Sequence, residues 1–273
     1  MKEQEPLILD GKYKSTETSF GNHFHNAYEM MYVTGGCIRV WIDDHEYVAR
    51  ENSLVLFSNL EEHSAELISG PFQRYYVTLS TNTADRLIAE PTLTSLLKNR
   101  PSDFCHVFDV SDLKPEMIHF FQVCFQEMEE KGEFSNEMCA ALLKQLLIYL
   151  YRKRRENFPN VENHMNEVIY EIQKYMDNNF SQPILIEEIA KSFYVDLFYL
   201  SHCFKQQTGY SPKQYLMKSR ISKAKEMLIH TNIAVSEVAY KCGFSDVNNF
   251  IRSFKSESDC TPNQYRKTRT TQT

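Results

Sequence analysis

Two stretches near the carboxyl end decide the fold: residues 184–215 read ILIEEIAKSFYVDLFYLSHCFKQQTGYSPKQY, and residues 233–265 read IAVSEVAYKCGFSDVNNFIRSFKSESDCTPNQY. Six residues of the first stretch recur in order in the second, namely Glu188, Ala190, Asp196, Phe204, Pro212 and Tyr215 as Glu237, Ala239, Asp246, Phe254, Pro262 and Tyr265. The offset is 49 residues before a predicted turn and 50 after it, which indicates two copies of one supersecondary unit. Each copy predicts a helix, a tight turn and a second helix, and this helix-turn-helix plan favours nucleic acid as the partner.

The residues around each predicted turn support this interpretation. Asp196 and Asp246 precede the second helices, where a side-chain oxygen can cap the first backbone N–H groups. Gly243 supplies a turn residue in the second copy, whereas the first copy has Phe-Tyr-Val at 193–195 and must turn without glycine. Residues 211–231 have a helical apolar pattern, and one long helix there would hold the two units about one DNA turn (~34 Å) apart.

Charge separates the two halves of the 273-residue chain. Residues 1–163 hold 16 Lys and Arg against 25 Asp and Glu (net −9), whereas residues 164–273 hold 14 against 11 (net +3). A basic carboxyl half joined to an acidic amino half indicates that one domain binds DNA. We expect a cytoplasmic protein without a membrane span, because the chain has no run of 18 apolar residues and no signal-like amino terminus. The seven scattered cysteines contain no CxxC pair, which is typical of reduced thiols.

The amino half begins with short runs of alternating hydrophobicity between residues 20 and 79. These runs are YEMMYV, CIRVWI, SLVLF and RYYVTLS, with turn signals at Gly35-Gly36 and Asp43-Asp44. They predict an antiparallel barrel or sandwich. From residue 114 the period becomes helical, over MIHFFQVCFQEMEEK and SNEMCAALLKQLLIYLYRKRR.

The second of these helices has a wide apolar face, which fits either packing on the barrel or a dimer seam. The face contains Met138, Leu142, Leu146 and Tyr149. The predicted fold class is therefore α+β in several domains. We expect an amino-terminal β-barrel with two helices at 1–155, a polar linker at 156–164, and an all-α domain with two helix-turn-helix motifs at 165–270.

With these motifs, residues 165–270 resemble the DNA-binding domain of AraC-type (AraC/XylS family) transcriptional regulators. The matching stretches are LIEEIAKSF, YLSHCFKQQTGYSPKQY, SEVAYKCGFSD and FIRSFKSESDCTPNQYR. The resemblance implies that the second helix of each unit enters a major groove of double-stranded DNA. The implied DNA-binding residues are Phe198, Ser201, His202, Lys205 and Gln206 in the first unit and Val247, Asn248, Ile251, Arg252 and Lys255 in the second. Arg252 can donate two hydrogen bonds to guanine, whereas Lys205 and Lys255 are suited to phosphates.

Three histidines and a glutamate form a second pattern, with His23, His25 and Glu29 close together and His63 much later. Alternate residues of a strand share a face, so His23 and His25 can point together. The pattern resembles the metal site of cupins, whose fold commonly forms the amino-terminal half of AraC-type proteins, and it implies a cupin-like barrel. Because NSLVLFSNLEEH lacks the proline and glycine usual before the last histidine of that site, we expect no bound metal and no cofactor. Polar contacts to a small molecule, a metal site and a structural role remain alternatives for these residues.

A pocket in a small barrel combines apolar walls with a few polar groups. Arginine beside aromatic faces is suited to a sugar or a small hydroxylated acid. The predicted effector-binding residues are His23, His25, Glu29, Arg39, Trp41, His63, Arg74 and Tyr76.

The sequence thus predicts a ligand-responsive transcriptional regulator without enzymatic activity. We expect an activator of sugar-utilisation genes that binds DNA as a homodimer and contacts RNA polymerase. One alternative is a metal-dependent cupin enzyme tethered to a DNA-binding module, which bound metal and turnover would reveal. The other is an AraC-type regulator with no small-molecule effector, whose stability no ligand would change.

Overall fold

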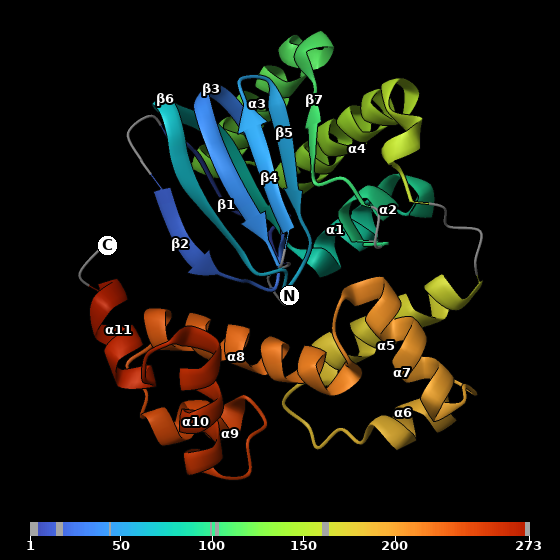
Figure 1. The fold of residues 1–273 in the computed structure, drawn as a ribbon, viewed down its shortest axis with the longest axis vertical. Coiled ribbons are helices and arrows are strands. Elements are labelled where there is room, and N and C mark those ends of the chain that lie inside the picture. Colours follow the sequence, from blue (N-terminus) through green and yellow to red (C-terminus); the bar gives the residue numbers. More distant parts are fainter. Residues whose placement is uncertain are drawn as a thin grey trace. The chain divides into compact units, whose positions relative to one another are not determined.

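The structure, a computed structural model, describes residues 5–14, 19–43, 45–98, 100–101, 104–159 and 164–270. The chain divides into two compact units, Met1–Val161 and Glu162–Thr273. Figure 1 shows that the first unit contains a β-sheet with helices against it, and that the second unit is helical. The predicted α+β fold class is confirmed.

A seven-stranded antiparallel sheet forms the body of the first unit. Its strands are β1 (Ile8–Lys14), β2 (Ser19–His23), β3 (Tyr28–Ile42), β4 (His45–Arg50), β5 (Ser53–Phe57), β6 (His63–Leu79) and β7 (Val107–Asp109). The order is β1-β6-β3-β5-β7, with β2 also paired to β6 and β4 also paired to β3. The long strands β3 and β6 pair from Tyr28 with Leu79 to Ile42 with His63. In one half of this ladder β6 also pairs with β1 and β3 with β5. In the other half β6 pairs with β2 and β3 with β4, so both long strands run through two parts of the sheet.

The prediction of a turn at Gly35-Gly36 is wrong, because β3 runs through both residues as one strand with register shifts between Val33 and Ile38. Gly36 has a φ of 80°, and a Cβ there would lie 2.7 Å from the Pro71 carbonyl oxygen. Only glycine tolerates this conformation and this close approach of β6. The two glycines therefore form an irregularity within a strand rather than a connection between two strands.

Two apolar cores lie on opposite faces of the sheet. The inner core, enclosed by the sheet itself, includes Val33, Ile38, Val40, Ile42, Phe57, Phe72 and Tyr76. The outer core packs other strand residues, such as Met30 and Tyr32, against the helices. Those helices are α1 (Thr81–Leu87), α2 (Pro91–Lys98), α3 (Lys114–Glu130) and α4 (Ser135–Lys153).

The sequence pattern predicted α3 and α4 but missed α1 and α2, which have seven and eight residues and are too short to show a helical period. Leu146 on α4 is only 2% exposed and belongs to the outer core, whereas Met138 is 48% exposed. Packing against the outer core therefore explains why residue 146 is apolar, and only part of the apolar face of α4 remains at the surface.

The end of the first unit lies beyond the predicted boundary at residue 155. A 3-10 turn, η2 (Arg155–Asn157), follows α4, and Phe158 packs edge-on against Tyr151 with ring centroids 5.1 Å apart. Phe158 is thus part of the outer core. Residues 160–163 of the predicted linker lie outside the described residues.

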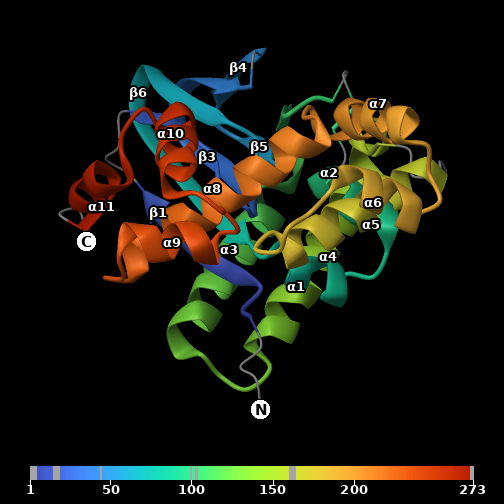
Figure 2. The same ribbon diagram turned by 90° about the horizontal axis from the view of Figure 1, so that it is seen from below.

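The second unit consists of helices in a repeated arrangement. They are α5 (His164–Asn179), α6 (Ile186–Ser192), α7 (Leu197–Thr208), α8 (Pro212–His230), α9 (Val235–Lys241), α10 (Val247–Ser258) and α11 (Pro262–Thr270). Helix α8 begins with a capping box between Ser211 and Gln214, and it runs between the α5–α7 group and the α9–α11 group (Figures 1 and 2). The predicted inward residues of this long helix are buried, namely Leu216, Ile221, Ala224 and Leu228. Of the helices in the described ranges, none is long and apolar enough to cross a membrane.

Candidate nucleic-acid interface and ligand site

The two helix-turn-helix units share one turn. The amide of Val195 donates to the Ala190 carbonyl at 2.9 Å, and the amide of Phe244 donates to the Ala239 carbonyl at 3.0 Å. The residue before each amide is left-handed: Tyr194 has a φ of 55° and Gly243 a φ of 81°. The first copy thus makes with tyrosine the turn that the second makes with glycine, and the additional residue of the second copy follows the turn, at position 245.

Both predicted capping residues hold the start of a second helix. The Asp196 carboxylate accepts hydrogen bonds from the amides of Phe198 and Tyr199, both at 2.9 Å. The Asp246 carboxylate accepts from the two matching amides, of residues 248 and 249, at 3.2 and 2.9 Å. These bonds satisfy N–H groups that a helix start otherwise leaves unpaired.

The same aromatic pair anchors each second helix. Phe204 of α7 packs edge-on against Tyr215 with centroids 5.3 Å apart, and Phe254 of α10 packs in the same way against Tyr265 at 5.5 Å. Both phenylalanines are fully buried, as predicted. Anchored on this side, α7 and α10 present the opposite face to solvent.

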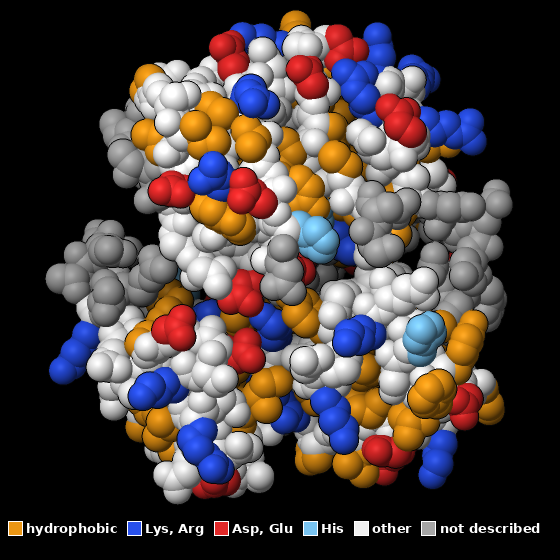
Figure 3. Space-filling view, viewed as in Figure 1, with side chains coloured by type: hydrophobic (Ala, Val, Ile, Leu, Met, Phe, Trp, Pro, Cys, Tyr) orange, Lys and Arg blue, Asp and Glu red, His pale blue; other side chains and the backbone are white. Residues whose placement is uncertain are grey.

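The residues implied to bind DNA lie on those solvent-facing sides. Phe198, His202, Lys205, Gln206, Asn248, Arg252 and Lys255 are exposed, and Ser201, Val247 and Ile251 are half-buried. Within each helix they recur at intervals of three and four residues, which places them on one face. Tyr194, which the sequence analysis did not single out, is 97% exposed, and Phe198 is 82% exposed. Figure 3 shows hydrophobic side chains gathered at the surface in the region of α6 and α7.

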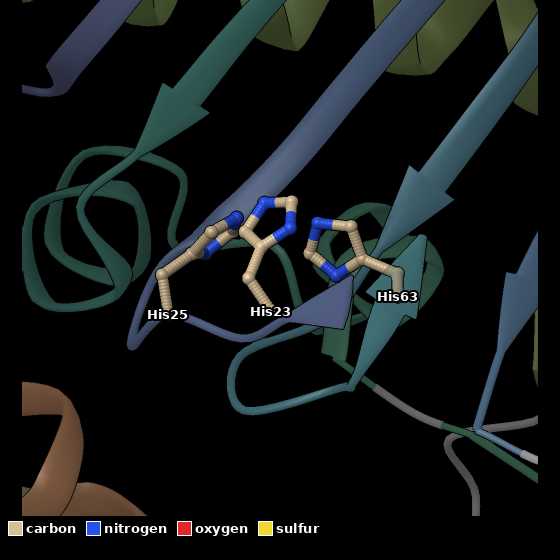
Figure 4. Close-up of side chains that lie close together, drawn as sticks. All are labelled: His23, His25 and His63. Carbon is tan, nitrogen blue, oxygen red and sulfur yellow. The ribbon is translucent and has the colours of Figure 1, made fainter. Parts of the chain in front are cut away.

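The histidine pattern converges on the inner face of the sheet, as Figure 4 shows. His23 on β2 is the register partner of His63 on β6, and their ring centroids lie 4.3 Å apart. His25, in the connection to β3, lies 5.2 Å from His63 by the same measure. One nitrogen of each ring lies within 4.8 Å of the others. The sequence pattern correctly grouped residues that are 40 positions apart.

Glu29 completes the cluster from β3. Its Oε2 lies 2.9 Å from Nε2 of His25 and 3.9 Å from Nε2 of His63. Although burial raises the pKa of Glu29, the hydrogen bond from His25 and the nearby imidazoles outweigh it and bring the pKa down to about 2. Burial and the neighbouring His23 hold the pKa of His63 well below its usual range. At neutral pH the cluster therefore holds a carboxylate and a neutral, buried His63.

Backbone carbonyls orient all three rings. Each Nδ1 atom lies at hydrogen-bond distance from a carbonyl oxygen two residues away. The distances are 2.9 Å for His23 to Gly21, 3.1 Å for His25 to Ala27 and 2.9 Å for His63 to Glu61. Each ring therefore directs its Nε2 edge away from its own backbone, and His63 also stacks on Phe57 at 4.1 Å.

Arg74 and Tyr76 lie on the same face as the cluster. Both are buried, and the Arg74 guanidinium carbon lies 5.1 Å from the centre of the Phe20 ring. Phe20, which sequence reasoning missed, also contacts His23 edge-on with centroids 5.7 Å apart. One aromatic ring thus links the histidines to a buried arginine, and the isolated position of Phe20 before the first predicted strand carried no signal of this role.

Arg39 and Trp41 do not join this site, contrary to the prediction. They alternate along β3 with Ile38, Val40 and Ile42, which enter the inner core, so their side chains point to the other face. There Arg39 pairs with Glu46 at 2.8 Å. The irregularity at Gly36 sets which residues of the second half of β3 face inward, and sequence alternation alone could not place it.

A further hollow lies between α3 and α4, away from the inner face. Its volume is about 280 Å³, and Leu142, Leu146 and Tyr149 line it together with Glu116 and His119. No sequence pattern predicted this hollow, because it depends on how the two helices cross.

Comparisons with known proteins agree with this arrangement. Residues 11–147 match the AraC-like ligand binding domain, and residues 189–268 match a helix-turn-helix domain. The HTH-type transcriptional activator RhaS of Klebsiella pneumoniae (strain 342) is 29% identical over 209 residues, covering 68% of this chain and 74% of that protein. RhaS of Escherichia coli O139:H28 is 31% identical with the same coverage. Among solved structures, ToxT from Vibrio cholerae covers 96% of this chain and 98% of its own, with a TM-score of 0.65 at 14% identity.

The fold and these matches define a ligand-responsive, DNA-binding transcription regulator with a sheet domain for a small molecule and a double helix-turn-helix domain. The chain belongs to the AraC family of transcriptional regulators.

Proposed function

We propose that this regulator is a cytoplasmic transcriptional activator that responds to a sugar or a similar small hydroxylated molecule. The observation that carries the proposal is the buried arrangement of Arg74, Glu29 and the three histidines beside aromatic rings on the inner face of the sheet. Such a surface combines donors, acceptors and apolar faces, as a binding site for sugar hydroxyls requires. The relatives named as transcriptional activators support the direction of regulation.

The effector residues in this proposal are those of the inner face: His23, His25, Glu29, His63, Arg74 and Tyr76. The Tyr76 hydroxyl donates to Asp10 of β1 at 2.8 Å. A ligand that competes for such contacts would also change how β1 pairs with β6. This gives the ligand a route to prefer one arrangement of the domain over another, which regulation requires.

The DNA contacts in this proposal come from the exposed faces of α7 and α10. On α10, Arg252 would read guanine, Asn248 adenine, and Val247 or Ile251 a thymine methyl, while Lys255 binds phosphate. On α7, Phe198, Ser201, His202 and Gln206 would face the bases, and Lys205 would bind phosphate. Two such helices held on α8 would enter two successive segments of the major groove on one face of the DNA.

We further propose that the active form is a homodimer that contacts RNA polymerase. The exposed part of α4 around Met138, with the hollow at Tyr149, offers apolar surface for a second copy. Burying such a surface in a two-fold dimer would double the DNA contacts on a paired site.

A thermal melt with a panel of sugars, sugar acids and an unsaturated fatty acid tests the effector class; a fatty acid is bound in one ToxT structure. A sugar that raises the midpoint with concentration binds the native state, and it should change DNA affinity by the factor by which DNA changes sugar affinity. Arg74→Gln should abolish the shift, whereas Arg39→Gln, on the outer face, should retain it. A shift with the fatty acid alone, or equal loss in both variants, would contradict the proposed site.

A further inference from the structure

The hollow between α3 and α4 has the composition of a small ligand site. Its volume of about 280 Å³ lies slightly below the ~300–1,000 Å³ of ordinary ligand pockets, so it admits a molecule of modest size. Its apolar lining comes from Pro115, Phe120, Leu142 and Leu146, together with the ring of Tyr149. Phe120 and Leu146 are almost fully buried and belong to the outer core. The packing of that core therefore holds the base of the hollow in place.

Polar side chains from both helices line the same hollow. Glu116 and His119 lie three residues apart on α3, and Gln145 and Tyr149 lie four residues apart on α4. Each spacing places both side chains on one face of their helix. The amide group of Gln145 donates to the Tyr149 hydroxyl oxygen at 3.2 Å. That bond uses a lone pair of the hydroxyl oxygen and leaves its O–H able to donate to a ligand.

The Glu116 carboxylate points to the charge of the ligand. Its Oε2 atom is buried and has no hydrogen-bond partner among the described residues. The nearby Lys114 pairs with Glu51 at 3.2 Å instead. A buried acceptor in this state is costly, because it has lost its water without gaining a donor. A bound donor would remove that cost.

A small organic cation fits this hollow better than a metal ion does. Of the lining residues, Glu116 and His119 are the strong metal ligands, and two such ligands are fewer than protein metal sites use. An ammonium group supplies three N–H donors and a positive charge, and charge-assisted bonds of this kind to a carboxylate are strong. The apolar lining in turn suits a ligand with an apolar body.

We propose that the hollow between α3 and α4 binds a small amine, whose ammonium group donates to Glu116 and whose apolar body packs against Phe120 and Leu142. The Tyr149 hydroxyl and the side-chain carbonyl of Gln145 supply further polar contacts. This site is separate from the proposed effector site, because its residues lie on α3 and α4 rather than on the inner face of the sheet. A bound amine joins the two helices through one molecule and stabilises their pairing.

The amine site adjoins the surface around Met138 that we propose as the dimer contact. Leu142 follows Met138 by four residues and therefore lies on the same face of α4. An apolar side chain of a second copy could cover the walls of the hollow, but it would leave Oε2 of Glu116 without a donor. The amine satisfies the carboxylate that such a dimer contact leaves unsatisfied.

The test uses 2-phenylethylamine as the probe, because it joins one ammonium group to one apolar ring. Its neutral counterpart is 2-phenylethanol, and its anionic counterpart is phenylacetate. Isothermal titration calorimetry with the full-length protein should give at least about tenfold tighter binding for the amine than for the alcohol, because the bond to Glu116 is charged. Phenylacetate should not bind. Added sodium chloride should weaken binding of the amine more than binding of the alcohol.

Three variants test the role of the carboxylate. Glu116→Gln keeps the shape of the side chain but removes its charge, so it should abolish the preference for the amine while the alcohol still binds. Glu137→Gln removes the same charge from an exposed position of α4 outside the hollow, and this matched control should bind like the original protein. Arg74→Gln, in the proposed effector site, should also retain amine binding, which separates a failure of one site from a failure of the other.

Amide hydrogen exchange of the original protein locates the bound amine. The amine should slow exchange over residues 116–122 of α3 and 142–149 of α4, because it holds these segments together. Exchange over residues 19–27, beside the proposed effector site, should stay the same. This measurement needs no variant, so it decides the location even if Glu116→Gln alters the fold.

Several outcomes would overturn the proposal. They are equal affinity for the amine and the alcohol, an undiminished preference for the amine in a folded Glu116→Gln, and protection confined to the sheet. Met138→Arg gives a further test, because it should bind the amine like the original protein. If only Met138→Arg binds the amine, a second copy covers the hollow and the proposed ligand is wrong.

Discussion

Replacing Gly243 with alanine should lower the free energy of unfolding of the second unit more than adding one methyl group at any other residue of its turns. Gly243 has a φ of 81°, and a Cβ there would lie 2.6 Å from the Phe180 carbonyl oxygen and 3.0 Å from Nε of Arg220. That oxygen cannot simply retreat, because it accepts a hydrogen bond from Arg220 at 2.8 Å, and the same guanidinium donates to the Gln182 carbonyl at 2.9 Å.

The magnitude follows from three contributions. A left-handed conformation costs a non-glycine residue about 1–2 kcal/mol. Displacing the guanidinium weakens charged hydrogen bonds, which contribute about 1.5–3 kcal/mol. Alanine restricts the unfolded chain and returns about 0.4–1 kcal/mol. We therefore expect Gly243→Ala to lower the free energy of unfolding by about 2–4 kcal/mol.

The first copy of the turn offers a matched control. Tyr194 occupies the same left-handed position with a φ of 55° and has a freely exposed side chain. In Tyr194→Gly, relief of the left-handed strain (~1 kcal/mol) and the greater freedom of the unfolded chain (~0.4–1 kcal/mol) oppose each other. The free energy of unfolding should therefore change by less than about 1 kcal/mol.

Urea unfolding of the full chain measures both variants with two signals. Far-ultraviolet circular dichroism reports the helices of both units, and fluorescence of Trp41 reports the first unit alone, so a dichroism change without a Trp41 change belongs to the second unit. Gly243→Ala should shift the dichroism transition and leave the Trp41 transition in place. If Gly243→Ala is as stable as Tyr194→Gly, the close approach of Phe180 does not constrain the turn and the reasoning is refuted.

Three further outcomes are expected. Arg252→Ala should cost about 1–3 kcal/mol at a selected site and relax one base position, seen by fluorescence anisotropy with altered sites; unchanged specificity would contradict the guanine contact. Met138→Arg should give folded monomers in analytical ultracentrifugation, whereas Leu146→Arg, in the core, should unfold the first unit; a dimer of Met138→Arg would exclude this seam. Burial and the nearby Arg100 lower the pKa of His106 to about 3, below its unfolded value of 6.5. The contribution of neutral His106 to the free energy of unfolding is therefore fully present above pH 6.5. It falls by up to ~1.4 kcal/mol per pH unit as the pH drops towards 3. His106→Asn should flatten this dependence in Trp41-monitored acid titrations.

Local interactions made much of the second unit predictable. The capping by Asp196 and Asp246 depends on amides two and three residues away, and the burial of Phe204 and Phe254 follows helical spacing. Because the motif occurs twice, each copy also tested the interpretation of the other. The left-handed tyrosine at 194 shows that even the missing glycine did not change the turn.

The first unit was less predictable, because its decisive contacts are distant in sequence. Runs within β3, β5 and β6 and both long helices were identified from their periods, whereas β1, β4 and β7 were missed. The course of β3 through Gly36 depends on the approach of Pro71, and that irregularity sets Arg39 and Trp41 on the outer face. The alternation of apolar and polar residues within one strand cannot reveal a register shift that contact with another strand imposes.

By itself, the sequence determined the double helix-turn-helix domain with its caps and anchors, because each unit is defined by short-range spacing. It also pointed to the residues of the histidine pattern, although His63 joined His23, His25 and Glu29 only through the resemblance to the cupin site. Only the tertiary structure decided that His23 and His63 are register partners, that Phe20 and Arg74 lie beside them, and that Leu146 is core. These outcomes depend on strand pairing and helix packing between segments tens of residues apart, and the free energy of such contacts exists only once the chain has brought them together.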